Sequence, residues 1–137
     1  YIGPQRAQAD AMSHHPKAKR LRMLDAVVWQ MEHMHEMPAI VIACAEFEST
    51  TNKTLIAQKS GSIWPGVQNL LLAARALELG ATPTTLGLKD RSAVADTLKL
   101  PSTMVAYCLI PIGYPLGRFG PVTRRPVEKV MRWNVWS

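Results

Sequence analysis

The sequence predicts a fold of the α/β or α+β class, in which a sheet and helices pack in layers. Two apolar runs, residues 39–45 and 103–112, are too continuous for strands with one solvent-facing side, so they predict central strands covered on both faces. A third run, residues 63–79, is rich in helix-forming residues and apolar on most sides. Predicted helices and strands alternate along the chain, and that order packs a sheet against helices.

The first long helix is expected to follow Pro16 and to end before Pro38. The residue before a proline avoids the helical backbone region, so Pro38 sets the limit. Positions on one predicted face recur at helical spacing; they are Leu21, Leu24, Val28, Met31 and His35. Residues 1–13 are weakly patterned, and at most one short helix is expected there, after Pro4.

The second long helix is expected to begin at about Ile63 or Trp64, because Pro65 is tolerated only in the first turn. Ser62 is its preferred N-cap, since a serine hydroxyl can accept from the orphan amides of the first turn. Gly80 is expected to end the helix in the left-handed conformation. A helix that is apolar on most sides is expected to be largely buried.

A third, short helix is expected over residues 91–98. Asp90 can cap its first turn, Val94 and Leu98 would point inward, and Pro101 would stop it. The other assignments are a polar surface loop near a site at 48–59, an extended Thr-rich segment at 81–88, a loop at 113–121, and a short helix or arm at 126–136 with Val127, Val130 and Trp133 on one side.

Length and composition predict one domain over residues 1–137. The chain is 47% hydrophobic, enough to bury a core, and 19% charged, which argues against disorder. Because it begins at Tyr1 without a methionine, we expect it to be truncated at the N-terminus. No apolar run reaches the ~20 residues that span a bilayer, so no membrane association is expected. Cys44 and Cys108 lie in apolar runs and predict buried free thiols in a reducing compartment, the cytoplasm.

The net charge of +6 predicts attraction to phosphate groups. Such groups occur in nucleic acids, nucleotide cofactors and anionic lipids. Basic residues gather at 17–22, expected to be a solvated face, and again at 118–132. A nucleic-acid binder stays a minor hypothesis, because no binding motif is present and few aromatic residues interleave with the basic runs. No nucleic-acid partner is therefore predicted.

Residues typical of metal or covalent catalysis are not arranged for either. His14 and His15 are adjacent, and His33 and His35 are two apart on a predicted helix, so neither pair has a metal-ligand spacing. The chain has no Gly-x-Ser-x-Gly turn and no obvious acid–base pair. We therefore predict no metal and no catalytic side chain.

A phosphorylated cofactor is the remaining option. Residues 82–87 follow the second helix, and backbone amides beside a glycine can approach a flat ring closely. Arg124 and Arg125 could each hold a phosphate with two hydrogen bonds. Taken alone, these signals fit a turn and a solvated arginine pair. Their order along the chain gives them weight.

Residues 68–81, QNLLLAARALELGA, resemble the signature helix of the FMN-dependent nitroreductase family. The later pieces are similar in order: Leu100-Pro101, an apolar strand, Ile112-Gly113-Tyr114-Pro115, then Arg124-Arg125-Pro126-Val127-Glu128-Lys129-Val130 and Trp136. The resemblance covers roughly residues 38–136. It implies an α+β fold with a central mixed sheet flanked by helices, and a homodimer with FMN at its interface.

The resemblance also implies an activity. Such proteins are oxidoreductases that move hydride from NAD(P)H to FMN and on to nitroaromatics, quinones or similar small acceptors. The motif places five residues along the face or edge of the flavin ring, with backbone amides near its redox-active side; they are Pro83, Thr84, Thr85, Leu86 and Gly87. Arg124 would reach the FMN phosphate, with Arg125 as the adjacent alternative.

One departure from the family pattern keeps an alternative open. The family begins with an Arg/Ser-rich segment that clamps the phosphate and ribityl chain of FMN, and nothing before Pro38 matches it. We expect that this first part is absent from the sequence. The alternative is a flavin-binding or structural relative that kept the fold and lost the chemistry.

Overall fold

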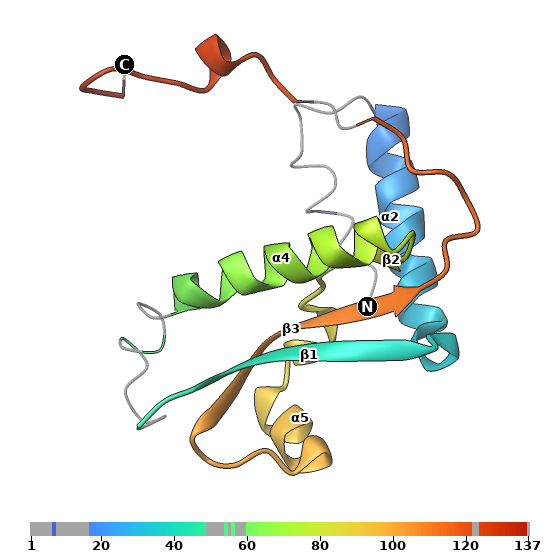
Figure 1. Ribbon diagram of the computed structural model, residues 1–137, viewed down its shortest axis with the longest axis vertical. Coiled ribbons are helices and arrows are strands. Elements are labelled where there is room, and N and C mark those ends of the chain that lie inside the picture. The colour runs from blue at the N-terminus through green and yellow to red at the C-terminus, as the bar shows by residue number, and fades with distance from the viewer. Residues whose placement is uncertain are drawn as a thin grey trace.

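The computed structural model describes residues 17–48, 60–121 and 124–136, together with residues 7, 54 and 56. Its helices and strands are α2 (Lys17–Glu32), β1 (Ala39–Glu46), α4 (Ile63–Ala76), β2 (Gly80–Ala81), α5 (Arg91–Leu98) and β3 (Met104–Gly113), with short 3₁₀ turns between them (Figure 1). The fold class is α+β, as the resemblance implied. The predictions for residues 1–13 and 48–59 lie almost wholly outside the described residues.

The sheet has three strands in the order β1-β3-β2, and both pairs are antiparallel in the described part of the chain. The expected mixed sheet is therefore wrong there. Residues 103–112 do form the central strand, but residues 39–45 form an edge strand whose first three residues are exposed. An apolar run predicts an apolar strand, but it does not predict how many strands pair with it.

The core lies between the sheet and α4. Cys108 and Ile110 of β3 are fully buried, and Val67 of α4 packs with them. Side chains alternate across a strand, so the residues on either side of Cys108 face the other way. Leu109 and Tyr107 accordingly contact Gly87 and Arg91. Helices α4 and α5 thus lie on opposite sides of the sheet (Figure 1).

Helix α4 begins at Ile63, as expected, but its ends are built differently from the prediction. Ser62 belongs to a 3₁₀ turn in helical conformation, and its side chain makes no capping hydrogen bond. The helix ends at Ala76, and Glu78, not Gly80, takes the left-handed conformation with φ 62°. The Leu79 amide donates to the Ala74 carbonyl at 2.9 Å, which closes the last turn. Gly80 is then free to enter β2.

The expectation that this helix is largely buried is also wrong for the single chain. Val67 and Ala74 are its buried residues, whereas Leu72 is 57% exposed and Trp64 41%. A helix lying on one face of a three-stranded sheet can bury only the stripe that faces the sheet. The apolar side of α4 that faces away from the sheet therefore remains exposed in the single chain.

Helix α5 matches its predicted bounds. The Asp90 carboxylate accepts a hydrogen bond from the Ala93 amide at 3.0 Å, which confirms the predicted cap. Lys99 ends the helix in the left-handed conformation, before Pro101 is reached. The inward position predicted for Leu98 is wrong, since 42% of this residue is exposed.

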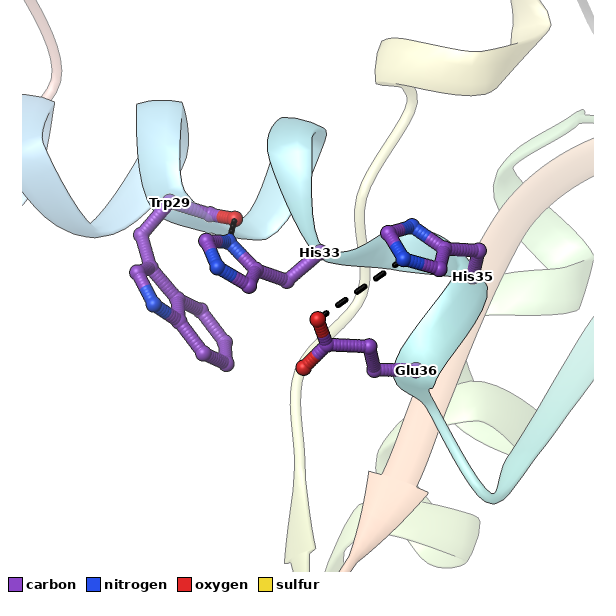
Figure 2. A network of polar contacts seen from close by, with 4 residues as sticks. All are labelled: Trp29, His33, His35 and Glu36. Carbon is purple, nitrogen blue, oxygen red and sulfur yellow. Dashed lines mark hydrogen bonds and ion pairs between the residues drawn. The ribbon is translucent and has the colours of Figure 1, made fainter.

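The two histidines that follow helix α2 make polar contacts with residues close to them in the sequence. His33 stacks on Trp29 with ring centroids 4.3 Å apart, and its Nδ1 lies 2.9 Å from the Trp29 carbonyl oxygen (Figure 2). His35 points elsewhere, with its Nε2 3.7 Å from a carboxylate oxygen of Glu36. The two histidines therefore serve separate local contacts. Among the described residues, no three His, Cys, Asp or Glu side chains form a group that could hold a metal ion.

Candidate functional site

A cleft of about 870 Å³ opens on the α5 side of the sheet. Its walls come from the 3₁₀ turn that precedes α4, the first residues of α4 and of α5, and the start of β3. The described residues that line it are Ile56, Ser60, Trp64, Thr85, Arg91, Ser92, Ala95, Leu100, Met104, Val105, Ala106 and Tyr107. The walls are mainly apolar, and Arg91 is the charged side chain among them.

The predicted ring-binding segment, residues 83–87, is anchored to the central strand. The Thr84 amide donates to the Leu109 carbonyl at 2.8 Å, and the Leu109 amide donates back to the Thr84 carbonyl at 2.9 Å. Thr84 itself is buried at 9% exposure. This isolated bridge extends the sheet past β2 and fixes where the segment crosses β3.

Hydrogen bonds within the segment tighten it further. The Thr84 hydroxyl accepts from the Leu86 amide at 3.3 Å, and the Leu88 amide donates to the Thr85 carbonyl at 3.0 Å. A Cβ at Gly87 would lie 3.3 Å from a methyl group of Leu109. Gly87 is therefore small because it packs on β3, a reason that the sequence could not supply.

These contacts reduce the number of backbone amides in the segment that could donate a hydrogen bond to a flavin ring. Pro83 has no N–H, and the amides of Thr84 and Leu86 are used within the protein. Donation to a flat ring would then fall to the amides of Thr85 and Gly87. Of the five predicted residues, Thr85 is the one that lines the cleft.

The cleft holds two residues that the sequence predictions missed, Arg91 and Tyr107. The Tyr107 hydroxyl donates to the Ile56 carbonyl at 3.2 Å, and the Arg91 guanidinium lies 5.9 Å from the centre of the Tyr107 ring. Burial raises the pKa of Tyr107, and the positive charge of Arg91 opposes part of that rise. A signal for Arg91 was present, because a cation in the first turn of a helix opposes the helix dipole.

The predicted phosphate ligands lie elsewhere in the protomer. Arg124 and Arg125 are exposed and belong to a C-terminal arm, residues 124–136. This arm extends away from the sheet and from α5 (Figure 1). The structure thus brings Thr85 of this segment to the cleft and does not bring the arginine pair to it within one chain.

The sequence profile of the Nitroreductase family matches residues 3–114. The chain belongs to the nitroreductase family. The matched region contains all five residues of the anchored segment and ends before the arginine pair. It also extends the resemblance into the residues before Pro38, where the sequence showed no recognisable family motif.

Two solved structures share this nitroreductase fold. One is iodotyrosine deiodinase bound to FMN and 3-iodo-L-tyrosine, with 24% identity and a TM-score of 0.56 over 79% of this chain. The other is the FMN- and NADPH-dependent nitroreductase NfnB from Sphingopyxis sp. strain HMH, with 16% identity and a TM-score of 0.58 over 98% of this chain. The alignments cover 57% and 58% of those chains, so this chain spans a little over half their length. No curated protein matches the sequence. In the described part, no helix is long and apolar enough to cross a bilayer.

Proposed function

We propose that this protein is an FMN-dependent oxidoreductase that transfers hydride from NAD(P)H to nitroaromatics, quinones or similar small acceptors. The observation that carries the proposal is the anchored segment, which lies inside the family match and directs Thr85 into the cleft. The structural relatives are an FMN-bound deiodinase and an FMN-dependent nitroreductase, which agrees with the same cofactor here. The two free thiols fit a reducing compartment such as the cytoplasm.

The residues present fit a flavin. Cofactor pockets are commonly about 300–1,000 Å³, apolar, with a few polar groups that fix orientation. The cleft has this size and character, with Trp64 and Thr85 among its walls. FMN, when bound, supplies the hydride chemistry, and the protein supplies binding, orientation and electrostatics.

Each predicted residue has a role in this proposal. The hydrogen bonds of Thr84 and Leu86 hold the segment in place. Thr85 and Gly87 present their backbone amides at the ring edge, Thr85 also presents its hydroxyl, and Pro83 lies along the ring. Amide donors there favour added negative charge on an electron-rich ring. Arg124 would hold the phosphate, with Arg125 as the alternative.

We propose that the protein works as a homodimer. The arm carries Trp133 and Trp136, 77% and 82% exposed, and α4 leaves both Leu72 and Trp64 exposed. Soluble monomers rarely leave so much large apolar surface uncovered. Because the arm leaves its own sheet, its arginines would reach the cleft of the partner protomer.

The test is flavin content and turnover. Purified protein is expected to show flavin absorbance, or to take up added FMN, and to oxidise NAD(P)H with a nitroaromatic or a quinone. A colourless protein that takes up no FMN would sink the proposal. Binding without turnover would support the alternative, a non-catalytic flavin-binding relative.

The role of Arg124 has its own test with a matched control. Arg124→Ala removes one charge-assisted contact and should weaken FMN binding by about tenfold or more. Lys17→Ala removes the same charge from the exposed start of α2 and should leave the affinity unchanged. Equal FMN affinities in the two variants, measured by fluorescence titration, would contradict the assignment.

A further inference from the structure

The cleft contains a positive charge that the proposed flavin chemistry leaves unexplained. Arg91 is the charged residue among the described residues of the lining, and no Asp or Glu is among them. The same cleft is lined by the apolar side chains of Ala95, Leu100 and Val105 and by the indole of Trp64. A guanidinium in the wall of an apolar and aromatic cleft is complementary to an apolar molecule that carries one anionic group.

The position of Arg91 is unfavourable for the helix that carries it. A cation in the first turn opposes the helix dipole, and Asp90 already caps this turn through the Ala93 amide. Arg91 is therefore not needed to begin α5. Its contact with Tyr107 is a long one at 5.9 Å, near the limit for a cation–π interaction. Neither the start of α5 nor the contact with Tyr107 explains why position 91 holds an arginine.

We infer that Arg91 selects acceptors that bear a carboxylate or a similar anion. The anion would pair with the guanidinium, and the apolar body of the acceptor would lie along the cleft toward Thr85. This inference rests on the proposed function, and it adds a substrate class to it. Arg91 is a specificity-determining residue in this assignment.

The experiment compares two acceptors of nearly equal shape, para-nitrobenzoate and para-nitrobenzamide. Both are titrated calorimetrically into the purified protein with its bound flavin, and both are then used as acceptors with NAD(P)H. Wild-type protein should bind the benzoate more tightly than the benzamide. Arg91→Ala should weaken benzoate binding by about five- to tenfold, the loss expected for one partly exposed charge-assisted contact, and leave the benzamide within about twofold.

Two further variants separate this role of Arg91 from others. Arg22→Ala removes the same charge from the exposed surface of α2 and should keep the preference for the benzoate. Arg91→Lys keeps the charge without the planar fork and should retain part of it. If Arg91→Ala weakened both acceptors equally, its role would be structural, and the inference would be overturned. Loss of FMN from Arg91→Ala would also overturn it, because the arginine would then serve the cofactor.

The binding measurement separates the two proposals. A wild-type protein that prefers the benzoate but shows no flavin turnover would sink the proposed function and leave the anion selectivity standing. A wild-type protein that reduces both acceptors with equal affinity would keep the function and overturn the selectivity.

Discussion

Residues 83–87 and the C-terminal arm contain all seven predicted cofactor-binding residues, yet the structure holds them in opposite ways. The segment is joined to β3 through the paired hydrogen bonds of Thr84 and Leu109 and through the packing of Gly87. The arm has one three-residue 3₁₀ turn, and every described residue from 124 to 136 is exposed. The position of the segment is therefore a property of one chain. In the proposed dimer, the position of the arm would depend on the partner protomer that it packs against.

The largest expected effect concerns the tryptophans of the arm. If the arm packs on a second protomer, Trp133→Ala and Trp136→Ala should each weaken the dimer by about 2 kcal/mol or more, since buried tryptophans are typical interface hot spots. Each change corresponds to about a thirtyfold rise in the dissociation constant. Sedimentation at several concentrations measures it.

A matched pair of measurements shows whether the arm stabilises its own chain. Both tryptophans are largely exposed, so neither variant should lower the unfolding free energy of the isolated protomer by more than about 0.5 kcal/mol. A protomer that is destabilised by the substitutions, or a wild-type protein that is monomeric at high concentration, would refute the contrast between the arm and the segment.

An effect on folding rather than on association is expected in the anchored segment. Thr84→Pro removes the amide that donates to Leu109, and it should cost about 2 to 3 kcal/mol of unfolding free energy. Thr84→Val keeps the amide and the side-chain shape but loses the hydroxyl that accepts from Leu86, so it should cost about 1 kcal/mol. Urea denaturation measures both. Equal losses in the two variants would mean that the backbone bridge does not hold the segment.

The sequence predicted this contrast only in part. Local signals were sufficient where the cause is local, as with the Asp90 cap and the bounds of α5. They failed at the ends of α4, where Ser62 makes no capping hydrogen bond and Glu78 takes the left-handed position. They failed again in the sheet, because the edge position of β1 is decided by its pairing with β3, which lies far along the chain. A short window of sequence cannot predict which distant strands pair with each other.

The residues of the candidate site likewise divide into those that the sequence predicted and those that it did not. Residues 83–87 were predicted from a family resemblance. The structure shows that Thr84 also forms hydrogen bonds with β3 and that Gly87 packs against it. Arg91 was missed because a lone arginine after a helix cap resembles a solvated charge. Only the cleft, formed by segments far apart in the sequence, shows that Arg91 and Thr85 line the same cavity.

The smallest expected effect follows the thiol of Cys108, which lies on the strand that anchors the segment. Burial raises the pKa of Cys108, and the neighbouring Cys44 adds to the rise. An acid with a raised folded-state pKa holds its proton longer in the folded state than in the unfolded one, so it stabilises the fold fully below its unfolded pKa of about 8.5. That contribution is lost as the pH rises through the folded value.

The stability advantage of wild-type protein over Cys108→Ala should therefore shrink between about pH 7.5 and about pH 10. The loss is at most about 1.4 kcal/mol for each pH unit that separates the unfolded pKa of the thiol from its folded pKa. Urea denaturation of both proteins at the two pH values measures it, and taking the difference removes other groups that titrate in this range, such as Tyr107. Wild-type and Cys108→Ala proteins that also carry Trp133→Ala should show the same pH dependence, because the arm holds no thiol and does not cover β3. An advantage that stayed constant with pH would mean that Cys108 is accessible to water, and that β3 is a looser anchor for residues 83–87 than its burial indicates.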